Sequence, residues 1–143
     1  DVVNREEAKS IGDENPLSFL HIDRPEMDLE PETDLYDDRV YEKAKENLDN
    51  MEEKGILVQD QKACYYIYEL VRKGKTQTGI VGCSSIDDYM NGVVKKHELT
   101  REDKEQDRIH HVDSCNANTG PIFLACRYPE SLLKLMNDWK ENH

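Results

Sequence analysis

The sequence lacks the long apolar runs of a membrane protein. Its 143 residues are 36% hydrophobic, and no stretch approaches the length needed to span a bilayer. The chain does not open with the charged, apolar and small-residue pattern of a signal peptide. We therefore expect a cytoplasmic protein. The length fits a single domain over residues 1–143 that buries a sizeable core.

Two kinds of ligand-binding motif are also missing. The four cysteines form no Cys-x-x-Cys pair, and together with the five histidines they show no zinc-ligand spacing, so no metal site is expected. In a cytosolic chain these cysteines are expected to be free thiols. No Gly-x-Gly-x-x-Gly motif or P-loop is present, which excludes the standard loops that cradle phosphates.

Positive charge is scarce in the first part of the chain. Residues 1–60 hold seven Lys and Arg against nineteen Asp and Glu, a balance of −12, whereas the later residues are neutral. Such an acidic surface repels the phosphates of nucleic acids and anionic membranes, so neither is an expected partner. A solvated surface that keeps the protein soluble accounts for most of this charge.

Capping residues and apolar spacing predict the helices. Asn4 followed by Glu7 forms a capping box for a helix over 5–11. A helix over 38–54 has an apolar stripe and ends at Gly55, and Thr100 with Asp103 caps a helix over 101–113. We also expect a short helical turn near residues 85–90 and a final helix after Pro129. Residues 23–36 are acidic and contain two prolines, which predicts a mobile surface loop.

Runs of β-forming residues predict the strands. Residues 63–72 and 76–86 flank a Lys73-Gly74 turn, which pairs Tyr66 with Val81 and Cys64 with Cys83 in an antiparallel hairpin. Apolar runs at 17–22 and 121–126 are expected to be buried strands. The sequence thus predicts an α+β fold, with a mixed, partly antiparallel sheet, a central hairpin and three to four packed helices.

The segment from Lys95 to Asp113 has the most unusual pattern, because its predicted helix carries few large apolar residues. Cationic side chains recur there at spacings of three and four, so they share one face of the helix, and Lys96 lies just before them. Such a stripe near a helix start can bind a phosphate or carboxylate. The candidate anion-binding residues are Lys96, Arg101, Lys104, Arg108 and His111.

Two interpretations of this segment stay open. Acidic residues alternate with the cations, so the helix can equally be a solvated surface helix of ion pairs. The adjacent His97 and Glu98 form a candidate acid–base pair, in which Glu98 accepts a proton from a substrate hydroxyl and His97 donates or shuttles one.

Several runs resemble DUF1015, a conserved bacterial family of unknown function. They are residues 15–21, residues 96–108, residues 111–113 and residues 117–121, and the similarity covers nearly the whole chain. Members of this family are much longer. The resemblance therefore implies an N-terminal segment, which stops before a later Gly-His-His-Arg motif that is similar to ParB and sulfiredoxin-like phosphotransfer folds.

The resemblance implies a function for the longer protein. It would be a ParB-like small-molecule phosphotransferase, such as a kinase for serine or a related compound, using ADP or ATP with Mg in the full-length protein. Its expected partners are a small anionic metabolite or nucleotide and the rest of its own longer chain. The alternatives are a non-catalytic metabolite-sensing or protein-interaction domain, and a structural cap on the later part of the chain.

Overall fold

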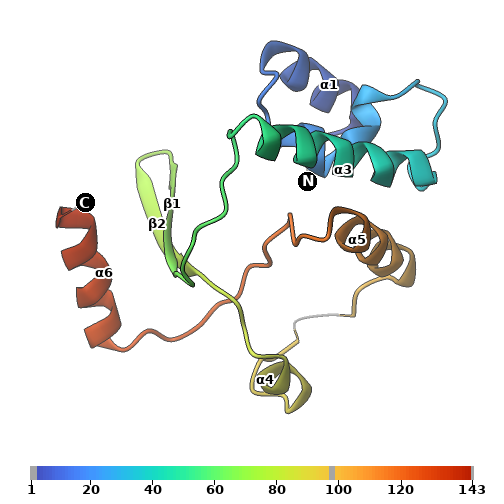
Figure 1. Cartoon of the computed structure of the whole chain (residues 1–143). Coiled ribbons are helices and arrows are strands. Elements are labelled where there is room, and N and C mark those ends of the chain that lie inside the picture. The colour runs from blue at the N-terminus through green and yellow to red at the C-terminus, as the bar shows by residue number, and fades with distance from the viewer. Residues whose placement is uncertain (1–2, 97–98, 143) are drawn as a thin grey trace. The chain divides into compact units, whose positions relative to one another are not determined.

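The computed structural model describes residues 3–96 and 99–142 (Figure 1). The chain divides into two compact units. The first unit holds residues 1–59 and 98–122, and the second holds residues 60–97 and 123–143. The single domain expected over residues 1–143 stays a prediction.

Helix α1 (Arg5–Glu14) opens the first unit, and its capping box is confirmed. The backbone N–H of Glu7 donates to the side chain of Asn4, and the backbone N–H of Asn4 donates to the side chain of Glu7, both at 2.9 Å. The helix continues past Gly12, where the sequence predicted its end. Gly12 is buried, and a Cβ atom there would lie 2.5 Å from Met27 and 3.1 Å from His21, so the packing favours glycine at this position.

Helix α3 (Asp38–Glu53) forms the centre of the first unit, and its predicted bounds are confirmed to within one residue. Asp37 caps its start, and Gly55 takes the left-handed conformation just after its end. The expected apolar stripe is buried, and part of it packs with Ile22 of α2 (Leu20–Asp23) and Cys115 of α5 (Glu102–Cys115). The buried residues of the stripe are Val40, Ala44, Leu48 and Met51.

The predicted strand over residues 17–22 is wrong. Asn15 turns the chain, and its side chain accepts a hydrogen bond from the backbone N–H of Leu17. Residues 20–23 then form the short helix α2, with Ile22 in the core. An apolar run this short fits a buried strand or a buried helix equally well, so its periodicity does not decide between them.

The predicted surface loop over residues 23–36 is also corrected. It contains a 3-10 helix, η1 (Pro25–Asp28), whose first three residues are buried. Arg5 of α1 donates hydrogen bonds to the backbone carbonyls of Leu29, Glu30, Pro31 and Thr33 at 2.6–3.2 Å. These bonds satisfy backbone groups that a free loop would expose to water, and they fix the segment against α1.

Helix α5 begins one residue later than predicted. Arg101, and not Thr100, occupies the position before its first turn, and no side chain caps the helix there. Its first turn carries Glu102, Asp103 and Glu105, and it ends at Asn116 in the left-handed conformation. Helices α3 and α5 pack together within the first unit.

The second unit is built on the predicted hairpin. Strand β1 (Tyr66–Arg72) pairs antiparallel with β2 (Lys75–Val81), and the expected register of Tyr66 opposite Val81 is confirmed. Lys73 and Gly74 both have positive φ, as a two-residue hairpin turn requires. Helices α4 (Ile86–Met90) and α6 (Glu130–Asn142) complete this unit. Cys64 and Cys83, expected to face each other, are exposed free thiols.

The α+β class is confirmed, although the sheet is smaller than expected. In the described part of the chain it consists of β1 and β2 alone. Residues 121–126, predicted as a buried strand, have no regular structure, and Ile122 and Phe123 are exposed. Pro121 supplies no backbone N–H, and no neighbouring strand of the described residues pairs with this segment.

The core of the first unit yields a stability prediction. Replacing Leu48 by Ala removes a buried side chain from the cluster around Ile22 and Ala44. We expect the free energy of unfolding to fall by about 3 kcal/mol, as is typical of buried leucines. Val58→Ala, at an exposed position, serves as the control. Equal urea midpoints for the two variants would contradict this core assignment.

Candidate functional site

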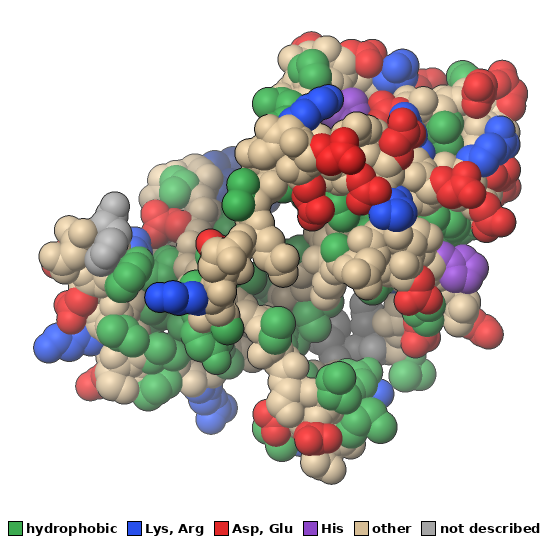
Figure 2. Space-filling model, viewed as in Figure 1, with side chains coloured by type: hydrophobic (Ala, Val, Ile, Leu, Met, Phe, Trp, Pro, Cys, Tyr) green, Lys and Arg blue, Asp and Glu red, His purple; other side chains and the backbone are tan. Residues whose placement is uncertain are grey.

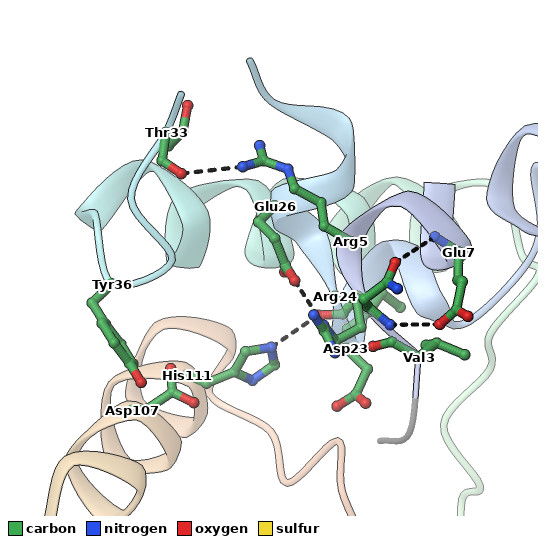
Figure 3. A network of polar contacts seen from close by, with 12 residues as sticks. Val3, Arg5, Glu7, Asp23, Arg24, Glu26, Thr33, Tyr36, Asp107 and His111 are labelled. Atoms are coloured by element: carbon green, nitrogen blue, oxygen red, sulfur yellow. Dashed lines mark hydrogen bonds and ion pairs between the residues drawn. The ribbon is translucent and has the colours of Figure 1, made fainter. Parts of the chain in front are cut away.

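A pocket of about 620 Å³ opens in the first unit, between the α2–η1 segment on one side and helices α3 and α5 on the other. Charged side chains of both signs and two tyrosines line it. The lining residues that carry the following argument are Asp23, Arg24, Glu26, Tyr36, Tyr41, Lys104, Asp107, Arg108 and His111. Figure 3 shows how several of them face one another from different segments.

Arg108 lies between two carboxylates of the pocket. Its Nη1 atom is 3.4 Å from Asp23 of α2, and its Nη2 atom is 3.3 Å from its neighbour Asp107. Both distances are long for charge-assisted hydrogen bonds, and half of the Arg108 side chain (51%) is exposed. The guanidinium group therefore retains donors that can bind a ligand.

Lys104 lies one turn before Arg108 on the same side of α5. Its ammonium group donates to the hydroxyl of Tyr36 at 2.9 Å and lies 5.4 Å from the centre of the same ring. That hydrogen bond raises the pKa of Lys104, which keeps the amine charged. Among the described residues no carboxylate forms an ion pair with Lys104, so its charge is available in the pocket.

Arg24, by contrast, is held rigidly. Its Nε donates to the buried carboxylate of Glu26 at 2.7 Å, and its Nη1 donates to the backbone carbonyl of Val3 at 2.7 Å. These short bonds tie η1 to the start of α1 (Figure 3). Arg24 is thus a fixed charge of the pocket wall, whereas Arg108 and Lys104 are the cations that can reorient.

Tyr41 of α3 orients the Asp107 carboxylate. Its hydroxyl donates to Oδ1 of Asp107 at 3.0 Å, and its ring meets the ring of His110 edge-on at 5.5 Å. Burial, together with this hydrogen bond, raises the pKa of Tyr41 to about 12. Tyr41 therefore remains a neutral donor at physiological pH, and it connects α3 with α5.

His111 lies at the base of the pocket and is 2% exposed. Its Nε2 atom is 2.9 Å from the carbonyl oxygen of Ile22, which can only accept, so Nε2 is the donor of this hydrogen bond. Its Nδ1 atom is 3.4 Å from the hydroxyl of Thr119. Both nitrogens have protein partners, so His111 positions α5 against α2, and its predicted role in anion binding stays a prediction.

The structure brings only part of the predicted stripe into the pocket. Lys104, Arg108 and His111 line it, but Arg101 does not. The Arg101 side chain is 76% exposed and pairs with Asp103 of the same turn at 2.7 Å. Lys96 belongs to the second unit, where its ammonium group lies 4.6 Å from the centre of the Tyr89 ring.

The candidate acid–base pair, His97 and Glu98, falls outside the described residues. Its catalytic role therefore stays a prediction. Glu98 precedes the pocket-lining Lys104 by only six residues in the sequence.

Sequence reasoning missed the wall of the pocket that faces α5. Asp23, Arg24 and Glu26 fell in a segment predicted to be a surface loop, and Tyr36 follows in the same segment. The one available signal was Arg24-Pro25-Glu26, in which proline separates two opposite charges that pair with each other in the structure. That arrangement is common in exposed turns, so it does not by itself indicate a site.

The described residues contain neither a cluster of potential metal ligands nor a helix that could span a membrane. No group of three or more His, Cys, Asp and Glu side chains gathers there as potential ligands for a metal ion. None of the helices in this part of the chain is long and apolar enough to cross a bilayer.

Acidic side chains cover the surface near α3 (Figure 2), where Glu42, Glu46, Asp49 and Glu53 line a shallow depression.

Comparisons with known proteins identify a family and no activity. A family model described as "Protein of unknown function (DUF1015)" matches residues 1–143, the full chain. No curated protein and no solved structure matches it. The function therefore has to be argued from the pocket and its chemistry.

The buried histidine yields a testable prediction. His111→Ala removes the donor to the Ile22 carbonyl and leaves a cavity, so we expect the free energy of unfolding to fall by about 3 kcal/mol. Gln106→Ala, at an exposed position of the same helix, is the matched control and should change stability by less than about 0.5 kcal/mol. Chemical denaturation measures both. A His111→Ala variant as stable as the control would contradict the proposed role of His111.

Proposed function

The chain belongs to the DUF1015 family, and we propose that the pocket of its first unit binds the phosphate group of a small metabolite or nucleotide. In this proposal the chain is part of a ParB-like small-molecule phosphotransferase. The observation that carries the binding proposal is the pair formed by Arg108 and Lys104, two cations that line one pocket and are weakly engaged by other protein groups.

Arg108 is the better placed of the two for phosphate. Its contacts to Asp23 and Asp107 are 3.4 and 3.3 Å, against 2.7 Å for the fixed pair of Arg24 and Glu26. A phosphate that offers two oxygens to the guanidinium plane would form shorter, bidentate bonds. Exchange of long contacts for short ones favours binding without disrupting the core.

Lys104 complements Arg108 as a point charge. Its only hydrogen-bond partner among the described residues is the hydroxyl of Tyr36, which costs little to replace by a charged oxygen. The Tyr36 hydroxyl would then be free to donate to the same ligand. Three carboxylates balance the three Arg and Lys side chains of the pocket, so an anion enters without facing a large excess of either charge.

The catalytic part of the proposal rests on the family resemblance and on the sequence. Glu98 would act as the general base toward a substrate hydroxyl, with His97 as its partner. ADP or ATP with Mg would be the phosphoryl donor, and serine or a related compound the acceptor. The Mg ion would neutralise phosphate charge during the transfer, and the protein's own residues would position the reacting groups.

A second candidate function is a non-catalytic metabolite-sensing or protein-interaction domain. Three acidic side chains in the first turn of α5 oppose phosphate binding at its backbone N–H groups, so ligand binding would rest on the pocket cations alone, which is all that a sensor needs. A sensor requires Arg108 and Lys104 but has no need of Glu98. The two functions therefore differ in what a substitution of Glu98 should do.

The phosphate-binding proposal predicts a ranking of variants. In calorimetric and thermal-shift titrations with ADP, ATP, serine and phosphoserine, Arg108→Ala should weaken binding of the phosphorylated ligands about tenfold or more, because it removes a bidentate donor. Lys104→Ala should weaken it by a smaller factor. Arg101→Ala is the control from the same helix, since Arg101 lies outside the pocket.

Equal losses for Arg101→Ala and Arg108→Ala would instead support binding along the whole stripe that the sequence predicts. No thermal shift in any of these proteins at millimolar ligand would contradict phosphate binding. The titrations are run on the full-length protein and on residues 1–143, so that a difference in affinity reveals any contribution of other residues to ligand binding.

Replacement of Glu98 by Gln separates catalysis from binding. The amide keeps the shape of the side chain but cannot accept a proton, so kcat should fall at least about a hundredfold while ligand binding stays within about twofold. Glu102→Gln, in the exposed first turn of α5, is the matched control. Unchanged turnover in the Glu98→Gln variant would leave the sensing function as the better description.

A further inference from the structure

One face of the β1–β2 hairpin presents large apolar and aromatic side chains that are partly exposed. Side chains alternate along a strand, so Tyr66, Tyr68 and Leu70 point to the same side, and all three are about half exposed. Gly79 lies opposite Tyr68 in the register, so the direct cross-strand partner of Tyr68 has no side chain to cover its ring. The result is an aromatic and apolar stripe on a regular, two-stranded surface.

The same face ends in positive charge. Arg72 continues the alternation of β1, and Lys75 is its cross-strand partner, so both lie on the side of Tyr68. Neither forms an ion pair with a carboxylate of the described residues. The second unit as a whole holds nine Lys and Arg against seven Asp and Glu, in contrast to the acidic first unit.

The opposite face of the hairpin is used differently. Glu69 and Thr78 are cross-strand partners there, and Lys140 of α6 forms an ion pair with Glu69 and donates to Thr78 at 3.4 Å. Lys140 therefore neutralises the carboxylate of Glu69 on that face. The charges of Arg72 and Lys75 are left without such a partner among the described residues. Figure 2 shows hydrophobic side chains at the surface over the hairpin and α6, which lie on the left in that view.

We propose that this face is a docking surface for an acidic amphipathic helix of a partner protein. The strand from Tyr66 to Arg72 is about 20 Å long, which matches a helix of about fourteen residues. An apolar side of such a helix would cover Tyr66, Tyr68 and Leu70, and carboxylates in its terminal turn would meet Arg72 and Lys75.

Charge decides among the possible occupants. Exposed aromatic rings beside cations also suit single-stranded nucleic acid, but such sites follow the phosphate backbone with a positively charged groove, whereas the two cations of this face, Arg72 and Lys75, lie at one end only. An acidic helix places only a few carboxylates, all beside the two cations, and it also covers apolar area. A protein partner is therefore favoured, and this inference does not depend on the function proposed for the pocket.

Defined probes test the inference on the intact chain. One probe is a fluorescent amphipathic peptide of about fourteen residues, with leucines along one side and glutamates in one terminal turn. We expect saturable binding that weakens about tenfold for Arg72→Glu/Lys75→Glu and for Tyr68→Thr. Lys62→Glu reverses a charge outside this face and should change the affinity by less than about twofold.

Rescue by charge reversal makes the test specific. A peptide with lysines in place of the glutamates should bind the Arg72→Glu/Lys75→Glu variant better than the original protein. The proposal is overturned if no acidic peptide binds at millimolar concentration, if Arg72→Glu/Lys75→Glu binds it unchanged, or if a thymidine oligonucleotide displaces it efficiently. Self-association in sedimentation that the same double substitution abolishes would also overturn it, because the occupant would then be a second copy.

Discussion

The hydrogen bond from His111 to the Ile22 carbonyl is the contact on which the arrangement of the first unit depends. Helix α5 has few large apolar residues, and two of them, Ile109 and Val112, remain about 40% exposed. An apolar stripe therefore does not explain how α5 is held. The buried imidazole, with Cys115 in the core and the Asp107 carboxylate bound by Tyr41, fixes the helix instead.

This way of holding α5 also creates the pocket. Because the helix repeats every 3.6 residues, the side that carries His111 also carries Arg108 and Lys104, three and seven residues earlier. The buried histidine thus turns both cations toward the α2–η1 segment. Arg24, fixed by Glu26, completes the positive part of the wall. One buried polar contact therefore links the stability of the unit to the charge of its pocket.

Local signals predicted the elements whose conformation is determined by residues close together in the sequence. The Asn4–Glu7 capping box, the stripe of α3 with Gly55 after it, and the Lys73-Gly74 turn each specify a conformation within a few residues. The apolar runs at 17–22 and 121–126 contain no capping, stop or turn signal of this kind. Their structure depends on partners distant in the sequence, and for these two segments those partners proved not to be strands.

The candidate site likewise has a part that local sequence signals predicted and a part that depends on distant residues. Helical periodicity was sufficient to group Lys104, Arg108 and His111, which a single element positions. Periodicity also placed Arg101 in this group. In the structure Arg101 instead pairs with Asp103 and lies outside the pocket. The facing wall lies up to 85 residues away along the chain, as in the contact of Arg108 with Asp23. Only tertiary packing brings such residues together, so no spacing rule predicts them.

The most direct measurement for the pocket is nuclear magnetic resonance of the arginine side chains during a titration with inorganic phosphate. The account predicts saturable shifts of the guanidinium signal of Arg108, with the signals of Arg101 and of Arg39 on α3 unchanged. A matched titration with chloride at equal ionic strength should leave Arg108 unaffected. Equal shifts of Arg101 and Arg108, or no shift of Arg108 at millimolar phosphate, would contradict a phosphate-binding pocket in the first unit.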